Sequence, residues 1–167
     1  MVKKELLDYV APCSLLCYTC IAFKDGPIPE CARKLHTYYD GYCELRSAHL
    51  PESERETWYR EFHTFHDTLG YLSMAACPGC RNHPDVANYC FKNCLIPVCV
   101  KERGLNFCAE CEDFPCQKAK EFLDCQDERV SHAWESGSRR IREIGAEAYF
   151  EEQKDISQYL HYKDKTE

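Results

Sequence analysis

The chain has 167 residues, 14 of them cysteine, and its 21 Lys and Arg against 28 Asp and Glu give a formal net charge of −7. Its length suits one domain of about 150 residues, so residues 1–167 are taken as a single domain and two full catalytic domains are excluded. Because an acidic chain offers no generic phosphate-binding surface, we expect no nucleic-acid partner.

Several features favour a reducing compartment. Glu5 and Asp8 interrupt the first residues, so no apolar run of secretory-signal length begins the sequence. No stretch of about eighteen uncharged apolar residues occurs, and the mean hydropathy is −0.56, so we expect no membrane span and no membrane partner. We therefore expect a cytoplasmic protein, in which closely spaced cysteines are typically metal ligands rather than disulfides.

In chain order, an N-terminal cysteine cluster over residues 11–20 precedes a helical hairpin predicted over residues 28–73. The first helix has an apolar residue at every third or fourth position: Cys31, Leu35, Tyr38, Tyr42 and Leu45. From Glu52 to Ser73, a second helix repeats this spacing: Trp58, Phe62, Phe65, Leu69 and Leu72. We expect the two apolar stripes to pack against each other as an antiparallel pair, which would bury Phe65.

Residues 77–125 form a cysteine-rich segment that proline and glycine interrupt at short intervals, so it is predicted to be mostly loop and turn. Ordering each residue costs about 1.5 kcal/mol, whereas one structural zinc site contributes about 10 to 16 kcal/mol in small peptides. We therefore expect metal to hold this segment folded. Helical patterns return around Lys118 to Asp124 and over residues 129–160, where C-terminal helices are predicted.

These elements predict the fold class. The protein should be mainly α with an irregular, metal-stabilised cysteine-rich segment. The helical hairpin would then be inserted between two cysteine clusters.

Two CxxC pairs, Cys77–Cys80 and Cys108–Cys111, are the strongest metal-binding signal. Two intervening residues let both sulfurs reach one tetrahedral zinc ion at about 2.3 Å, while the turn donates N–H groups to sulfur. The long interval between the pairs leaves open whether they share one ion or each bind their own. The expected ligands are ten thiolates, enough for two zinc ions: Cys13, Cys17, Cys20, Cys77, Cys80, Cys94, Cys99, Cys108, Cys111 and Cys116.

The remaining cysteines carry a weaker signal. Cys31, Cys43 and Cys125 are isolated in the sequence, so we expect them to be small hydrophobic residues rather than ligands. Cys90 stays open between that role and metal binding.

Iron–sulfur binding is the main alternative, because sets of four cysteines also hold two-iron and four-iron clusters. Cys13, Cys17 and Cys20 have the C-x3-C-x2-C spacing with which radical S-adenosylmethionine enzymes hold three irons of a cubane. Those enzymes need a β/α barrel, however, and no strand–helix alternation follows the motif. The ferredoxin run of cysteines is absent as well, so zinc is favoured over iron–sulfur.

The common catalytic motifs are absent. The sequence has no HExxH, GxSxG, Walker or GxGxxG pattern, and no single thiol stands out as a nucleophile. We expect His63 and His66 to pack at the edge of the apolar stripe. The basic group Arg139, Arg140 and Arg142 is expected to be solvated surface charge. No catalytic residue is assigned, and whether the protein is an enzyme stays open.

Four groups of residues carry a family resemblance. They are Ala11-Pro12-Cys13 with Cys17 and Cys20, then Cys77-Pro78-Gly79-Cys80-Arg81, then Cys94 to Cys99, and then the run from Lys101 to Cys116. Together they resemble an uncharacterised prokaryotic family of cysteine-rich proteins, a domain of unknown function, that is expected to bind zinc. The resemblance runs from Ala11 to Gly145 and departs at Ser14, where members commonly have glycine. It implies metal binding and no established activity.

The sequence therefore predicts a structural zinc-binding protein that acts through interaction with a protein partner. The alternative is an iron–sulfur redox or sensor protein. A third interpretation is a metalloenzyme in which a zinc ion with an open position activates water.

Overall fold

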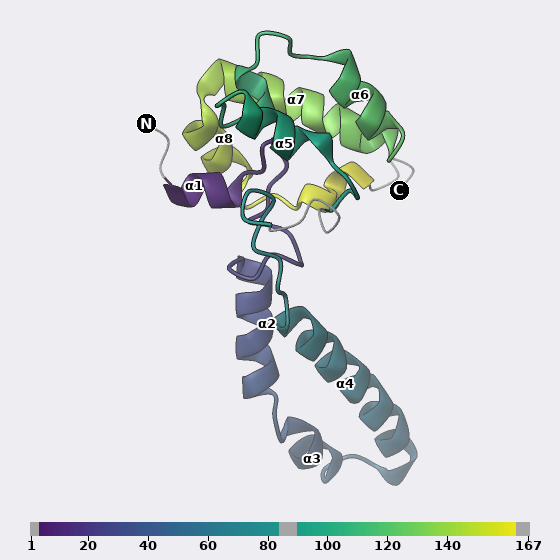
Figure 1. Cartoon of the computed structure of the whole chain (residues 1–167). Helices are drawn as coiled ribbons and strands as arrows, with labels where there is room; N and C mark the ends of the chain where they lie inside the picture. Colours follow the sequence, from purple (N-terminus) through teal and green to yellow (C-terminus); the bar gives the residue numbers. More distant parts are fainter. Residues whose placement is uncertain (1–3, 84–89, 163–167) are drawn as a thin grey trace. The chain divides into compact units, whose positions relative to one another are not determined.

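The computed structural model describes residues 4–83 and 90–162, without the side chains of residues 161 and 162. The structure is 62% helix, and the described residues contain no β-strand, which confirms the predicted mainly helical fold. Two isolated β-bridges join Val10 to Leu16 and Phe23 to Cys77. None of the described helices is both long and apolar enough to cross a membrane. The chain divides into two compact units, Ile21–Cys77 and the rest, which is made of Met1–Cys20 and Pro78–Glu167 (Figure 1).

The unit Ile21–Cys77 is the helical hairpin. Helix α4 runs over Glu52–Ser73 and has the bounds that the sequence predicts. The first predicted helix is instead two helices, α2 (Pro27–Tyr38) and α3 (Tyr42–Ser47). Gly41 lies between them with a φ of 73°, a left-handed conformation that glycine adopts readily and that ends the helical path.

The buried side chains of the hairpin differ from those that the apolar spacing predicts. Phe62 and Leu69 on α4 are buried, as the sequence predicts, but Phe65 is 44% exposed. On the opposite side, the side chains of the predicted stripe are exposed: Cys31, Leu35, Tyr38, Tyr42 and Leu45. The buried residues of α2 and α3 are Pro29, Ala32, Cys43 and Ser47 instead. The prediction that the two stripes bury each other is therefore wrong.

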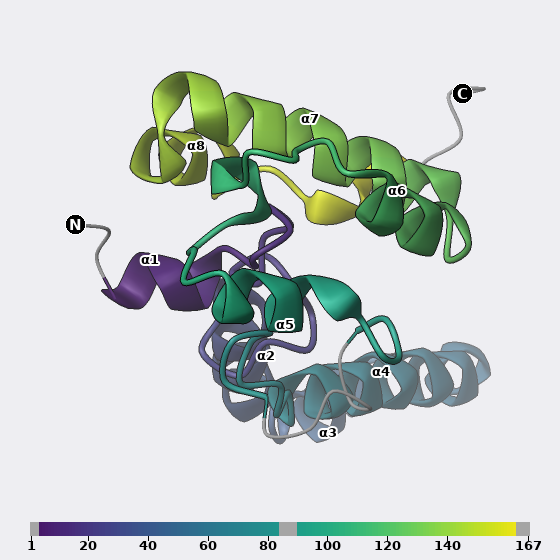
Figure 2. The ribbon, with the colours of Figure 1, turned by 45° about the horizontal axis from the view of Figure 1, so that its top comes forward.

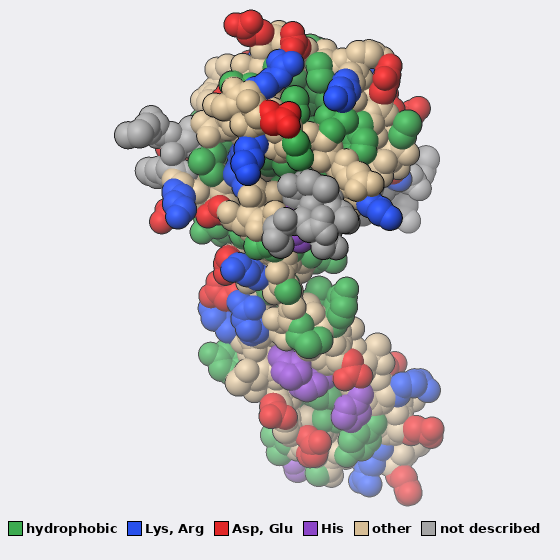
Figure 3. Space-filling view, viewed as in Figure 1, with side chains coloured by type: hydrophobic (Ala, Val, Ile, Leu, Met, Phe, Trp, Pro, Cys, Tyr) green, Lys and Arg blue, Asp and Glu red, His purple; other side chains and the backbone are tan. Residues whose placement is uncertain are grey.

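The two predicted edge histidines lie on the surface of the hairpin, where imidazole side chains adjoin one another in Figure 3. His66 stacks on His36 with ring centroids 3.9 Å apart. His63 is exposed and stacks on Tyr59. Both histidines thus pack against other rings, as the sequence predicts.

The second unit is built around helix α7 (Glu128–Ile144), which Figure 2 shows spanning it. Helices α6 (Gln117–Asp124) and α8 (Ala146–Gln153) pack against α7, and α1 (Lys4–Tyr9) packs against α8. Helix α5 (Leu95–Glu102) packs against α6. Two short 3-10 helices, Cys108–Glu110 and Gln158–Tyr162, also contact α7.

Helix α5 lies inside the segment that the sequence predicts to be mostly loop. Pro97 is the third residue of this helix. A proline is tolerated in the first turn, because the N–H groups there have no partner within the helix. The proline thus marks the start of a helix here rather than a break.

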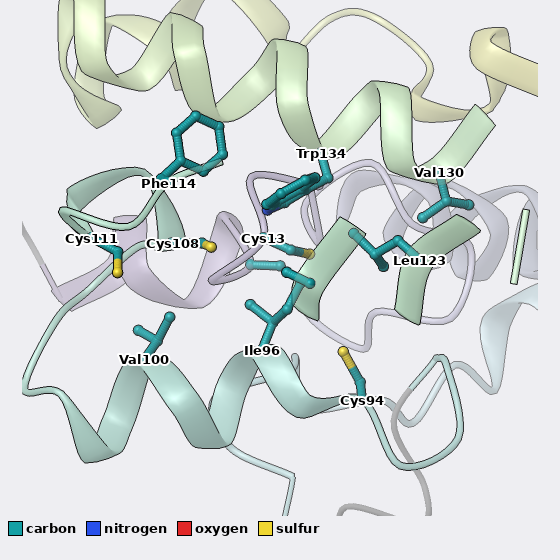
Figure 4. Close-up of a cluster of buried hydrophobic side chains, with 12 residues drawn as sticks. Cys13, Cys94, Ile96, Val100, Cys108, Cys111, Phe114, Leu123, Val130 and Trp134 are labelled. Carbon is teal, nitrogen blue, oxygen red and sulfur yellow. The ribbon is translucent and has the colours of Figure 1, made fainter. Parts of the chain in front are cut away.

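Cysteine sulfurs are part of the main hydrophobic core of this unit (Figure 4). The fully buried indole of Trp134 on α7 meets the Phe114 ring edge to face, with centroids 5.2 Å apart. Around this pair lie aliphatic side chains from α5, α6 and α7 together with buried thiols: Ile96, Val100, Leu123, Val130, Cys13, Cys94, Cys108 and Cys111. A smaller core beside it joins α1, α7 and α8. The core therefore places thiols from distant parts of the sequence close together.

Candidate metal centres

Four cysteines line one small cavity of about 40 Å³, and we call them the four-cysteine site: Cys99, Cys108, Cys111 and Cys116. Cys99 comes from α5, Cys108 begins a 3-10 helix, Cys111 follows it, and Cys116 directly precedes α6. Cys108 and Cys111 are buried, and the other two are half-buried. Four thiols from one short stretch of chain thus surround a space of about the size of one ion.

Burial and neighbouring charges both raise the pKa of Cys108 in this site. Burial raises the pKa of Cys108 to about 11, and the neighbouring thiolates of Cys116 and Cys111 add to this increase. A hydrogen bond from the Trp134 side chain opposes the increase in pKa. This bond is not well aligned, since Trp134 Nε1 is buried without a partner of good geometry in the described part of the chain. In Figure 4 the indole nitrogen lies toward the Cys108 sulfur, where it could stabilise a thiolate.

A cation lies directly beside the four-cysteine site. Arg103, which follows α5, donates a hydrogen bond from Nη1 to Cys111 Sγ at 3.0 Å. The same Nη1 lies 2.7 Å from Asp113 Oδ2, which holds the guanidinium in place. The Arg103 side chain therefore supplies positive charge and a donor to sulfur, two features that stabilise thiolate ligands.

The loop that carries three of these thiols is fixed by a second arginine. Arg142 on α7 donates hydrogen bonds to the carbonyl oxygens of Ala109 and Cys111. Its guanidinium also lies over the Phe114 ring, 4.8 Å from the centroid. Glu110 Oε2 accepts hydrogen bonds from the backbone N–H groups at 106 and 107, which closes the turn. The prediction that Arg142 is only solvated surface charge is therefore wrong.

The other two arginines of that group do lie on the surface. Arg139 pairs with Glu135 at 2.6 Å, and Arg140 pairs with Glu152 at 2.6 Å. Exposed pairs of this kind contribute little to stability. Arg139 also lies over the Phe114 ring, 5.9 Å from the centroid, but the hydrogen bonds to the loop carbonyl oxygens of Ala109 and Cys111 come from Arg142.

Six further cysteines line a second, larger cavity of about 200 Å³, which we call the six-cysteine cavity: Cys13, Cys17, Cys20, Cys80, Cys90 and Cys94. Apart from sulfur the lining is mostly apolar, and it includes Leu15, Leu16, Phe91 and Pro97. Among the described residues, its lining includes no His, Asp or Glu. All soft ligands of this cavity are therefore thiols.

The thiols of the six-cysteine cavity interact with one another. Hydrogen bonding from Cys80 lowers the pKa of Cys17 and lowers the pKa of Cys90 to about 6. Burial raises the pKa of Cys13, and the nearby thiolate of Cys94 raises it further. The Tyr159 hydroxyl donates to Cys20 Sγ at 3.6 Å. These contacts join the three N-terminal thiols with thiols that follow residue 78.

The backbone beside Cys13 is held in an unusual conformation. Ser14 has a φ of 68°, in the left-handed region that favours glycine. Its hydroxyl donates to the Cys13 carbonyl oxygen and lies 3.2 Å from the Trp134 carbonyl oxygen. Tyr149, whose pKa burial raises to about 12, donates to the Ser14 carbonyl oxygen at 3.0 Å. This network fixes the turn from which Cys13 extends into the cavity.

The structure places nine of the ten predicted ligands in these two groups. Cys77 is the exception, because it belongs to the hairpin unit and pairs through its backbone with Ala22 and Lys24. Cys90, which the sequence left open, lines the six-cysteine cavity. Among the isolated cysteines, Cys43 is buried as expected, whereas Cys31 and Cys125 are exposed.

The thiols surround cavities rather than converge on single points. Within residues 4–83 and 90–160, no group of three or more Cys, His, Asp or Glu side chains is already arranged to hold a metal ion. A cysteine side chain can move its sulfur by rotation about one torsion between staggered rotamers. Both groups have ligands of a suitable type for thiophilic metals.

Comparison with known proteins gives one match. No curated protein and no solved structure matches the chain. A family model matches residues 9–121, which is more than half of the chain and includes every thiol of both groups. The resemblance seen in the sequence is confirmed to the extent that the matched family is one without an assigned function. The chain belongs to this family, which is described as "Protein of unknown function (DUF3795)".

Proposed function

We propose that this protein is a structural zinc-binding protein that acts through interaction with a protein partner, and that one zinc ion binds at the four-cysteine site. The carrying observation is that Cys99, Cys108, Cys111 and Cys116 line one cavity of about 40 Å³. Four thiolates are the usual ligand set of a closed structural zinc site, with Zn–S distances of about 2.3 Å. The cavity would accept one ion after the cysteine side chains rotate to other rotamers.

The charge around the site supports this proposal. Four thiolates and one Zn²⁺ ion leave a net charge of −2, which a nearby cation partly balances. Arg103 is that cation, with its Nη1 3.0 Å from Cys111 Sγ. Trp134 Nε1 is a second donor beside Cys108, and it would gain a stronger acceptor in a metal-bound thiolate.

Metal binding would also explain how the loop keeps its conformation. Between α5 and α6 the only described regular structure is the 3-10 helix Cys108–Glu110, and the other backbone hydrogen bonds of this stretch belong to turns and to a contact with the Pro12 carbonyl oxygen. Closing a loop with a zinc ion contributes about 10 to 16 kcal/mol in small peptides. That free energy would offset the conformational entropy that the loop loses on folding.

The hairpin offers the surface for an interaction. Large side chains are exposed on both of its sides, among them Tyr38 at 79%, Leu45 at 62% and Tyr71 at 71%. Aromatic residues with little cover are enriched in protein–protein interfaces. A protein partner of this zinc-binding protein would cover this surface of the hairpin.

Zinc analysis of a matched pair of variants tests the proposal. Cys116→Ser removes a thiol of the four-cysteine site, whereas Cys125→Ser removes an exposed thiol that lines neither cavity. We expect wild-type and Cys125→Ser protein to bind zinc after dialysis against a weak chelator, and Cys116→Ser to bind at least one ion fewer. Equal zinc content in all three proteins would contradict the assignment.

A further inference from the structure

The six-cysteine cavity differs from the four-cysteine site in three respects. It has two more thiols than one tetrahedral ion uses. Its volume is about 200 Å³ against about 40 Å³. The described residues of its lining carry no charged side chain, whereas Arg103 and Asp113 line the smaller cavity. The two groups of thiols are therefore suited to different metal centres.

The volume of the six-cysteine cavity indicates whether it suits a set of bare metal ions or a larger inorganic group. The smaller cavity has about one fifth of the volume of the larger one, which suits a centre of few atoms. The larger cavity has room for several atoms besides the protein's own sulfurs. Zinc ions bound only by thiolates lie in the spaces between those sulfurs and need no additional volume. An iron–sulfur cluster brings its own sulfide ions and does need it.

The ligand types and their surroundings agree with this conclusion. Thiolates are the ligands that iron–sulfur clusters use, and they are the only metal-binding side chains in the part of the lining that the structure describes. Leu15, Leu16 and Phe91 give the cavity apolar walls. The Tyr159 hydroxyl donates to Cys20 Sγ, which is the kind of contact that stabilises cluster-bound sulfur.

The cluster ligands would come from both chain segments that form this unit. Cys13, Cys17 and Cys20 lie in one N-terminal segment, while Cys80, Cys90 and Cys94 follow the hairpin in the sequence. Cys80 interacts with both Cys17 and Cys90, so the two segments already meet through their thiols. A cluster at this place would tie the N-terminal segment to the rest of its unit.

We propose that the six-cysteine cavity binds an iron–sulfur cluster, through four of the thiolates Cys13, Cys17, Cys20, Cys80, Cys90 and Cys94, while zinc binds at the four-cysteine site. This inference deepens the proposed function. Its zinc ion rests on that proposed function, whereas its cluster does not. It replaces the expected second zinc ion by a polynuclear centre.

Metal and sulfide analysis of the full chain tests the inference. The wild-type protein is purified without oxygen, and iron, acid-labile sulfide, zinc and visible sulfur-to-iron absorption are measured before and after reconstitution with ferrous iron and sulfide. We expect iron and sulfide in equal amounts, about two to four of each per chain, together with about one zinc ion. Wild-type protein that binds no iron after reconstitution, or that binds two zinc ions and no iron, overturns the inference.

Variants assign the cluster to the cavity. Cys17→Ser and Cys80→Ser replace half-buried thiols that contact each other, and we expect them to lose most of the visible absorption and iron while keeping zinc. Cys125→Ser, outside both groups, is the matched control and should keep both metals. Full iron content in both cavity variants would overturn the assignment.

The two proposals fail separately. Iron and sulfide without zinc would contradict the zinc site and leave the cluster in place. Zinc that is lost in Cys116→Ser, with no iron in any protein, would support the zinc site and overturn the cluster.

Discussion

The guanidinium of Arg142 donates a hydrogen bond to the carbonyl oxygen of Cys111, although 31 residues separate them in the sequence. Through this contact helix α7 fixes the backbone of the loop that carries three thiols of the four-cysteine site. Arg142 is thus a positioning residue, which contacts the loop without being a ligand.

Replacing Arg142 by Gln should loosen this loop. Hydrogen bonds to a charged group contribute about 1.5 to 3 kcal/mol, so we expect Arg142→Gln to lower the free energy of unfolding by about 2 kcal/mol. Zinc should also dissociate faster, because the Cys111 backbone loses its support. Urea unfolding and zinc release to a coloured chelator measure the two effects. Arg140→Gln, which removes only surface pairs with Glu143 and Glu152, is the control and should change both by little.

The close contact of α7 with the N-terminal turn gives a second prediction. A Cβ atom added at Gly137 would lie 2.6 Å from Ser14 Oγ and 2.8 Å from the Tyr149 hydroxyl oxygen. We expect Gly137→Ala to destabilise the protein by about 1 to 3 kcal/mol, even though alanine is the better helix former. Gly70→Ala on α4 is the matched control, since its nearest neighbour, His36, lies at 3.4 Å.

Ser14 should be coupled to Gly137. Ser14→Gly removes the hydroxyl and relieves the positive φ, so the loss of a hydrogen bond of about 1 kcal/mol is offset by a similar gain. We expect the double variant Ser14→Gly, Gly137→Ala to be more stable than the sum of the single effects predicts. A thermal-melt double-mutant cycle measures this coupling, and strict additivity would show that the two positions do not clash.

Two substitutions on helix α4 of the hairpin should lower the free energy of unfolding by different amounts. Phe62 is 8% exposed and Phe65 is 44% exposed, although both belong to the same predicted stripe. We expect Phe62→Ala to cost about 3 to 5 kcal/mol and Phe65→Ala less than about 1 kcal/mol. Hydrogen exchange of α4 amides would register the difference, and similar losses of protection in both variants would contradict the observed burial.

The sequence predicts the bounds of α4 correctly because every signal there agrees. Pro51 precedes the helix, acidic residues occupy its first turn, and the apolar spacing continues to Leu72. It does not predict the break at Gly41, because apolar spacing continues across this glycine in the sequence. Periodicity shows which residues could share one straight helix, but it does not show where the backbone leaves it.

The sequence predicts which cysteines are candidate ligands better than it predicts which of them lie together. Spacing identifies Cys108, Cys111 and Cys116 because neighbouring ligands are close in the sequence. It misleads at Cys77, whose CxxC pattern spans the boundary between the two compact units. It leaves Cys90 open, because its proximity to Cys17 and Cys80 depends on how the chain folds. Only the family resemblance, which extends to Gly145, indicates a role for Arg142.

Removing the metal should affect the two units differently. We expect a strong chelator, or Cys111→Ser, to unfold the described residues between Cys77 and Cys116, whose conformation would depend on bound metal. The hairpin helices between Ile28 and Ser73 should keep most of their protection, since they contain none of the thiols of either group. Hydrogen exchange with and without chelator measures this. Uniform loss of protection in both units would point to a single metal-dependent core.

X-ray absorption at the zinc edge tests the zinc site most directly. For zinc-loaded wild-type protein we predict a shell of four sulfur atoms at about 2.3 Å, and we predict that Cys116→Ser loses zinc or replaces one sulfur by oxygen or nitrogen. The Cys125→Ser protein should keep the four-sulfur shell. A shell dominated by nitrogen or oxygen in the wild-type protein, or an unchanged four-sulfur shell with full zinc content in Cys116→Ser, would contradict zinc binding at the four-cysteine site.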